Sequence, residues 1–95
     1  MVSLHKIVQA KRQIEAFVSH TPCVLSTRIS TRIDALVYLK KENLQITGAY
    51  KVRGAFNKIA NLSSEQKQKG VVAASAGNHA QGVASMARQF WIKAC

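Results

Sequence analysis

The chain has 95 residues, of which 47% are hydrophobic, with one proline and five glycines. This composition excludes a disordered tail, and no apolar run reaches the ~18 residues that a membrane-spanning helix needs. The formal net charge of +10, from 14 basic and four acidic residues, raises nucleic acid or an anionic surface as a partner.

The N-terminal segment predicts an amphipathic helix. Ser3 can cap a helix that runs to about Val18, because its hydroxyl can accept a hydrogen bond from the first turn. Thr21-Pro22 ends the helix, and an irregular or short helical stretch follows to Ile33. The apolar residues of the helix form one face and predict packing, not membrane binding: Leu4, Ile7, Val8, Ile14, Phe17 and Val18.

A lysine lies at the start of the next long helix. The sequence predicts a buried strand at Leu36–Leu39, a polar exit at residues 41–43 and a helix from near Ala49. Lys51 falls in its first turn, where the positive end of the helix dipole and partial desolvation favour the neutral, nucleophilic amine. The alternative is a solvated surface group, because most lysines are exposed and this chain has nine. The stripe that defines this helix is Val52, Ala55, Phe56 and Ile59.

A glycine-containing loop joins a strand to the last helix. Residues 71–74 are short, apolar and β-favouring, and residues 78–90 carry apolar side chains at helical spacing. Between them Gly77 permits a tight turn or a close ligand, and Ser75 and Asn78 add short polar side chains beside unpaired helix amides. Such a corner can bind a carboxylate or phosphate. A capped turn without a ligand is the alternative interpretation.

The remaining patterns complete one α/β unit. Ser63 and Gln66 form a capping box for a short helix that Gly70 closes. Strands that alternate with helices predict a partial parallel sheet flanked by helices. We expect one incomplete α/β unit over residues 1–95, without an internal repeat or a second domain.

Charge, cysteine and histidine patterns add no second function. The basic residues are scattered and do not alternate with aromatic residues, so a nucleic-acid partner is not expected. Cys23 and Cys95 are far apart, and the three histidines lack metal-ligand spacing, so no metal site is predicted. Because Met1–Lys6 leads into an amphipathic pattern and not an apolar signal sequence, we expect a cytoplasmic protein.

Two long motifs resemble a known enzyme family. Residues 41–58 read KENLQITGAYKVRGAFNK and residues 70–84 read GVVAASAGNHAQGVA. Together they closely resemble the N-terminal part of pyridoxal-phosphate-dependent threonine (serine) dehydratases, also called threonine ammonia-lyases. Thr21-Pro22, Ser26 and residues 37–40 resemble the family's approach to the lysine. The resemblance covers nearly the whole chain and implies a fold type II enzyme, similar to the tryptophan synthase β chain.

The resemblance also implies roles for single residues. Lys51 would hold pyridoxal 5'-phosphate covalently and move the substrate α-proton, while Tyr50 would contact the cofactor and Asn78 would bind its ring oxygen. The loop Ser75, Ala76, Gly77, Asn78 and His79 would hold the substrate carboxylate; ordinary polar packing is the alternative for His79. The reaction would be β-elimination from L-threonine or L-serine, giving 2-oxobutanoate or pyruvate and ammonia. The resemblance further implies a small amino-acid substrate, a homo-oligomeric parent enzyme, and a place in isoleucine biosynthesis or threonine catabolism.

The chain also departs from the family. Ala49 and Tyr50 stand where the family often has serine and phenylalanine, and the tail from Arg88 to Cys95 matches only at residues 92–94. The family's glycine-rich phosphate loop and its group facing the pyridine nitrogen have no counterpart here. We therefore expect a fragment that is inactive alone. The alternatives are a non-catalytic remnant without cofactor and a parent enzyme with serine racemase-like activity.

Overall fold

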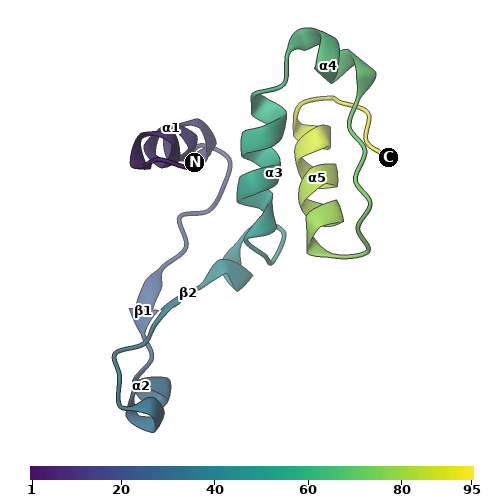
Figure 1. Cartoon of the computed structure of the whole chain (residues 1–95). Helices are drawn as coiled ribbons and strands as arrows, with labels where there is room; N and C mark the ends of the chain where they lie inside the picture. Colours follow the sequence, from purple (N-terminus) through teal and green to yellow (C-terminus); the bar gives the residue numbers. More distant parts are fainter.

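The computed structural model describes residues 1–95 and divides them into a helical region and a projecting arm (Figure 1). The arm consists of β1, α2 and β2, and it extends away from α1, α3, α4 and α5. The molecule is accordingly elongated, with extents of 52 × 31 × 24 Å. In chain order the elements are α1 (Leu4–Ile14), β1 (Cys23–Leu25), α2 (Thr27–Ile33), β2 (Tyr38–Lys40), the 3-10 helix η1 (Glu42–Leu44), α3 (Lys51–Ala60), α4 (Ser64–Lys69) and α5 (Asn78–Gln89).

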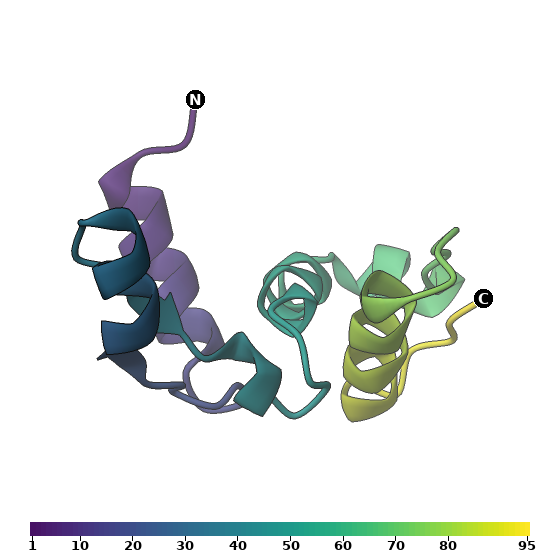
Figure 2. The same cartoon turned by 90° about the horizontal axis from the view of Figure 1, so that it is seen from below.

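The core lies where α3 packs against α5. The predicted stripe of α3 is buried, and it meets Val83, Met86 and Ala87 of α5. Phe56 stacks on Phe17 at a centroid distance of 4.5 Å and meets Phe90 in a tilted arrangement at 5.1 Å. Figure 2 shows α3 between α1 and α5, and in Figure 1 α3 and α5 begin at the same end of the molecule. The apolar periodicity of α3 was therefore a correct guide to the core, whereas that of α5 was correct for Val83 and Ala87 but not for Ala84, which is exposed.

The sheet is smaller than predicted. The predicted strand at residues 71–74 is reduced to one parallel bridge between Val71 and Ala94. The Val71 amide donates to the Lys93 carbonyl at 2.8 Å, and the Cys95 amide donates to the Val71 carbonyl at 3.0 Å. The parallel direction agrees with the prediction. The two segments are short and have no further strand beside them, so their pairing is limited to this bridge.

The arm contains an antiparallel ladder that sequence patterns did not predict. Val24 of β1 pairs with Leu39 of β2, and the Ser26 amide donates to the Val37 carbonyl at 2.8 Å. The predicted strand at Leu36–Leu39 was displaced, because β2 begins at Tyr38 and Leu36 is 75% exposed. Burial therefore does not define this strand; its backbone pairing with β1 does.

The first helix also differs from its prediction. Ser3 caps it as expected, accepting from the Lys6 amide at 3.3 Å, but the helix ends at Ile14 instead of Val18. Only Ile14 and Val18 of its predicted apolar face are buried, whereas Leu4 is 76% exposed. The face was expected to pack along its whole length, yet α1 meets α3 only near its C-terminal end, so its first turns have no apolar partner.

The two other predicted helix starts have different outcomes. The capping box is confirmed, because the Gln66 amide donates to the Ser63 hydroxyl and the Ser63 amide donates to the Gln66 side chain. The lysine helix begins at Lys51 and not near Ala49. Gly48 has φ +68°, and this left-handed turn delays the helix by two residues.

Candidate functional site

Lys51 is the first residue of α3. Its side chain is half-buried, and its Nζ atom lies 5.2 Å from the centroid of the Tyr50 ring. Tyr50 is the N-cap residue of α3, makes no side-chain capping bond and is 59% exposed. The amine therefore lies beside an aromatic face at the positive end of a helix dipole, in agreement with the predicted first-turn position.

The loop before α5 leaves helix amides without partners. α5 begins at Asn78, and its N-cap residue Gly77 has no side chain that could cap it. Ser75 does not cap the helix either, because its hydroxyl accepts from the Gly77 amide at 3.3 Å. The first helical amides, those of Asn78 to Ala80, donate to no protein group. An uncapped helix start of this kind offers converging donors to an anion.

A glycine in α5 brings the two motifs together. A Cβ atom on Gly82 would lie 3.3 Å from the Lys51 carbonyl carbon and 3.3 Å from the Val52 nitrogen. A side chain at this position would crowd the Lys51 backbone, so glycine favours the close approach of α5. Sequence reasoning placed Gly82 in the motif without giving it a role; the available signal was a glycine inside a helical pattern.

The shared direction of α3 and α5 adds an electrostatic effect. Both helices begin at the same end of the molecule (Figure 1), so their positive dipole ends lie on one side of the core. Lys51 starts one helix and Asn78 starts the other. This arrangement favours an anionic ligand at that end, whichever group carries the charge.

His79 and Lys51 do not line the same cavity. It contributes to a cavity of about 240 Å³ whose lining includes neither Lys51 nor Asn78. A larger cavity of about 590 Å³ lies on the other side of α3, against α1 and the start of the arm. The smaller cavity is lined by Gly54, Ala55, Lys58, Ile59, Leu62, Val71, Val72, His79 and Val83.

A polar network that sequence reasoning missed lies two residues beyond Lys51. Arg53 donates to both carboxylate oxygens of Glu42, each at 2.9 Å, and to the Ser19 carbonyl at 3.2 Å. The hydrogen bond from Arg53 is the main reason that the pKa of Glu42 falls from 4.5 to about 2, and the Thr21 hydroxyl adds to it. The sequence feature that could have indicated this network is the pair of opposite charges, Glu42 and Arg53, on either side of Lys51.

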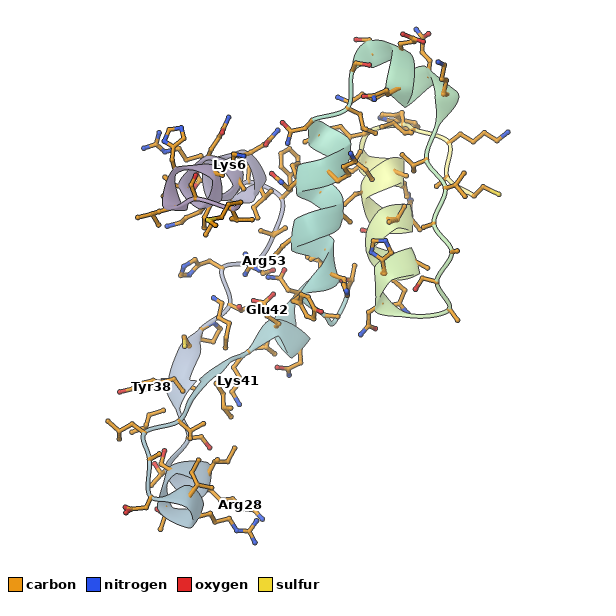
Figure 3. The ribbon with its side chains drawn as sticks, in the orientation of Figure 1. Lys6, Arg28, Tyr38, Lys41, Glu42 and Arg53 are labelled. Atoms are coloured by element: carbon orange, nitrogen blue, oxygen red, sulfur yellow. The ribbon has the colours of Figure 1, made fainter.

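The excess positive charge is not gathered into one surface. Figure 3 shows Lys6 on α1, Arg28 on α2 and Lys41 after β2, well apart from one another. Two ion pairs form, Arg53 with Glu42 and Lys69 with Glu65. No helix of the structure has the length and apolar character to cross a membrane.

Comparison with known proteins defines the family. The family model described as "Pyridoxal-phosphate dependent enzyme" matches residues 14–95, and the chain belongs to this family. The chain is 51% identical over 94 residues to an L-threonine ammonia-lyase of Thermotoga maritima, covering 99% of this chain and 23% of that protein. It is 53% identical over 95 residues to the L-threonine dehydratase catabolic TdcB of Staphylococcus aureus, covering 99% and 28%.

A solved structure agrees with the sequence relatives. Serine racemase from Dictyostelium discoideum superimposes with a TM-score of 0.91 at 38% identity, over 98% of this chain and 30% of that chain. These findings confirm the fold class, the N-terminal part of a fold type II enzyme, and the dependence of the family on pyridoxal phosphate. The chain spans about a quarter of the length of the curated relatives it matches.

The residues present fit such a cofactor. A primary amine lies at one helix start, an aromatic ring lies beside it, and unpartnered amides lie at a second helix start on the same end. The amine can react with the aldehyde of the cofactor, and the amides can donate hydrogen bonds to an anionic group. The roles of the individual residues remain predictions.

Proposed function

We propose that this chain is the lysine-bearing part of a threonine or serine ammonia-lyase. The observation that carries the proposal is the close approach of Gly82 to the Lys51 backbone, which joins the lysine turn to the uncapped start of α5. The motifs around both helix starts resemble those of the dehydratases, and the relatives that cover the chain are named as such enzymes.

Each residue of the site has a role in this proposal. Lys51 holds the cofactor covalently and later carries the substrate α-proton on its amine. Tyr50 would contact the ring of the bound cofactor, and Asn78 would donate a hydrogen bond to its ring oxygen. The loop Ser75, Ala76, Gly77, Asn78 and His79 binds the substrate carboxylate through its amides and hydroxyl. When bound, pyridoxal phosphate supplies the electron withdrawal that acidifies the α-carbon.

The products follow from loss of the β-hydroxyl group. L-threonine yields 2-oxobutanoate and ammonia, and L-serine yields pyruvate and ammonia. The structural match to a serine racemase favours racemisation of serine as the second candidate activity of a whole enzyme of this kind. A homo-oligomeric, cytoplasmic enzyme of isoleucine biosynthesis or threonine catabolism is part of the same proposal.

Residues 1–95 form one incomplete α/β unit in this proposal, and the unit does not turn over substrate alone. Only 14 residues are buried, which is a small core, and enzymes of this kind bind ligands in a cleft between two domains. A remnant that keeps the motifs without binding cofactor is the competing interpretation.

Covalent trapping tests the lysine assignment. The purified chain is incubated with pyridoxal phosphate, reduced with borohydride and digested, and the label on each lysine is measured by mass spectrometry. We expect the label on Lys51 to exceed that on Lys58, which lies on the same helix and is exposed. Lys51→Ala should remove this selective label, and Lys58→Ala is the matched control. Equal labelling of all lysines would contradict the assignment.

Complementation tests the proposed reaction. The region of the Staphylococcus aureus relative that follows its match to this chain is supplied as a second polypeptide, and 2-oxo acid release from L-threonine and L-serine is measured. We expect turnover with both polypeptides and none with either alone. Turnover by the 95-residue chain alone would overturn its proposed incompleteness.

A further inference from the structure

The junction between the arm and α3 contains a connected set of polar side chains. In Figure 3 Glu42 and Arg53 lie together at this junction. The Glu42 carboxylate accepts two bonds from Arg53 and one from the Thr21 hydroxyl, and Thr21 is 2% exposed. The Gln45 side chain donates to the Ser19 carbonyl at 2.7 Å and accepts from the Ser19 amide at 3.1 Å. Three chain segments are therefore tied at one point.

This network holds the start of α3, which has no side-chain cap. The N-cap residue Tyr50 provides no side-chain bond, and the left-handed turn at Gly48 separates η1 from the helix. Arg53 is the third residue of α3, so its fork to Glu42 connects the first turn directly to η1. The start of α3 is thus held through a side chain beyond the lysine.

The geometry of a helix explains how this fixation reaches Lys51. Successive residues are rotated by about 100°, so Lys51, Val52 and Arg53 point in three directions around the first turn. Val52 is fully buried against the core, and Arg53 is held by a bidentate ion pair. Because the directions of Val52 and Arg53 are fixed, the direction in which the Lys51 side chain leaves the helix backbone is fixed as well.

We propose that Glu42 and Arg53 act as a pair of positioning residues that fix the direction in which the Lys51 side chain leaves the first turn of α3. This inference rests on the proposed function, because it assigns the pair to the lysine that holds the cofactor. Neither residue touches the reacting atoms in this proposal. Their contribution is the rotation and register of the first turn of α3.

The chemistry of the pair suits this task. A guanidinium presents two parallel donors to a carboxylate, and this fork fixes orientation as well as distance. The Glu42 side chain is 17% exposed, and its carboxylate stays ionised above about pH 2. The fork is therefore present at every pH at which the lysine could react with an aldehyde.

The first experiment needs no cofactor. Amide hydrogen exchange is measured by NMR in the unaltered chain and in Arg53→Met, which removes the fork and keeps an apolar stem. We expect exchange at Ser19 and Gly48 to rise about tenfold, while Val83 in the core changes less than twofold. Glu65→Gln, which breaks the exposed Lys69–Glu65 pair, is the control. Unchanged exchange at Ser19 and Gly48 would overturn the inference.

The second experiment tests whether the pair fixes the direction of the Lys51 side chain. The ratio of pyridoxal phosphate label on Lys51 to label on Lys58 is determined in variants whose melting curves show that they remain folded. We expect Arg53→Met and Glu42→Gln each to lower the ratio about tenfold, and Arg53→Lys to lower it less, because a lysine keeps the charge without the fork.

A double variant separates a pair from two independent residues. If Glu42 and Arg53 act as one unit, Glu42→Gln with Arg53→Met should lower the ratio no further than either change alone. If Lys51 is still labelled selectively in Arg53→Met, in Glu42→Gln and in the double variant, this inference is overturned and the proposed function stays intact. Equal labelling of Lys51 and Lys58 in the unaltered chain would overturn the proposed function itself.

Discussion

The helical region and the arm are stabilised differently. α3 and α5 bury eight residues between them, whereas no residue of α2 is buried and both strands of the arm are largely exposed. Backbone pairing of β1 with β2 and the network around Glu42 hold the arm instead. Both motifs of the candidate site begin helices of the packed region, which gives the site a rigid base.

Removal of an aromatic ring from the core should give the largest loss of stability. Phe56 is almost fully buried, stacks on Phe17 and packs in a tilted arrangement against Phe90. Phe56→Ala should lower the free energy of unfolding by about 3 to 5 kcal/mol, because it removes apolar contact and leaves a cavity. Denaturant unfolding followed by circular dichroism measures the change. A loss below 1 kcal/mol would show that α3 and α5 do not form the core.

Two glycines in the packed region should respond in opposite directions. A side chain on Gly82 meets the backbone of Lys51, so Gly82→Val should destabilise the chain by about 1 to 3 kcal/mol. A Cβ on Gly54 meets nothing within 4 Å, so Gly54→Ala should stabilise the chain by about 0.5 to 1 kcal/mol through helix propensity. Thermal melting compares the two variants, and equal shifts would contradict the close approach of α5 to Lys51.

Acid should weaken the junction between the two regions. The pKa of Glu42 is about 2 in the folded chain against 4.5 ordinarily, so its contribution is complete above pH 4.5 and is lost as pH falls toward 2. We expect a loss of about 2 kcal/mol in the free energy of unfolding between pH 6 and pH 2.5, allowing for partial solvent screening. Urea unfolding at several pH values measures this loss.

The small number of acidic residues makes this pH dependence easy to assign. The chain has only four acidic residues, so few other carboxylates contribute. Glu42→Gln should remove most of the pH dependence, whereas Glu65→Gln, on the exposed helix α4, should leave it unchanged. Equal slopes for both variants would assign the dependence to another group.

The smallest effect is expected in the arm. Leu36→Ser replaces an apolar side chain that is already in solvent, and it should change the free energy of unfolding by less than about 0.5 kcal/mol. Limited proteolysis offers a second measurement, because a segment with few buried contacts opens more readily than a core. We expect cleavage within residues 26–36 before any cleavage within α3 or α5.

Much of the packed region could be predicted from local patterns. The stripe of α3, the capping box at Ser63 and the cap at Ser3 are properties of neighbouring residues, and the structure confirms them. The stripe of α5 is confirmed only at Val83 and Ala87. The motifs that include Lys51 and Ser75–His79 were recognised in the same way. Periodicity failed in α1 and in the arm, where apolar residues are present but no partner surface covers them.

By itself the sequence determined the approximate positions of α1, α3, α4 and α5, which family the chain resembles and which amine is the candidate anchor, because each of these depends on residues close together in the chain. Only the tertiary structure decided that β1 pairs with β2, that Gly82 lies against the backbone of Lys51 and that Arg53 forms an ion pair with Glu42. These contacts join segments that are distant in sequence or separated by a turn, and their distances depend on how the helices pack. No local pattern encodes such distances.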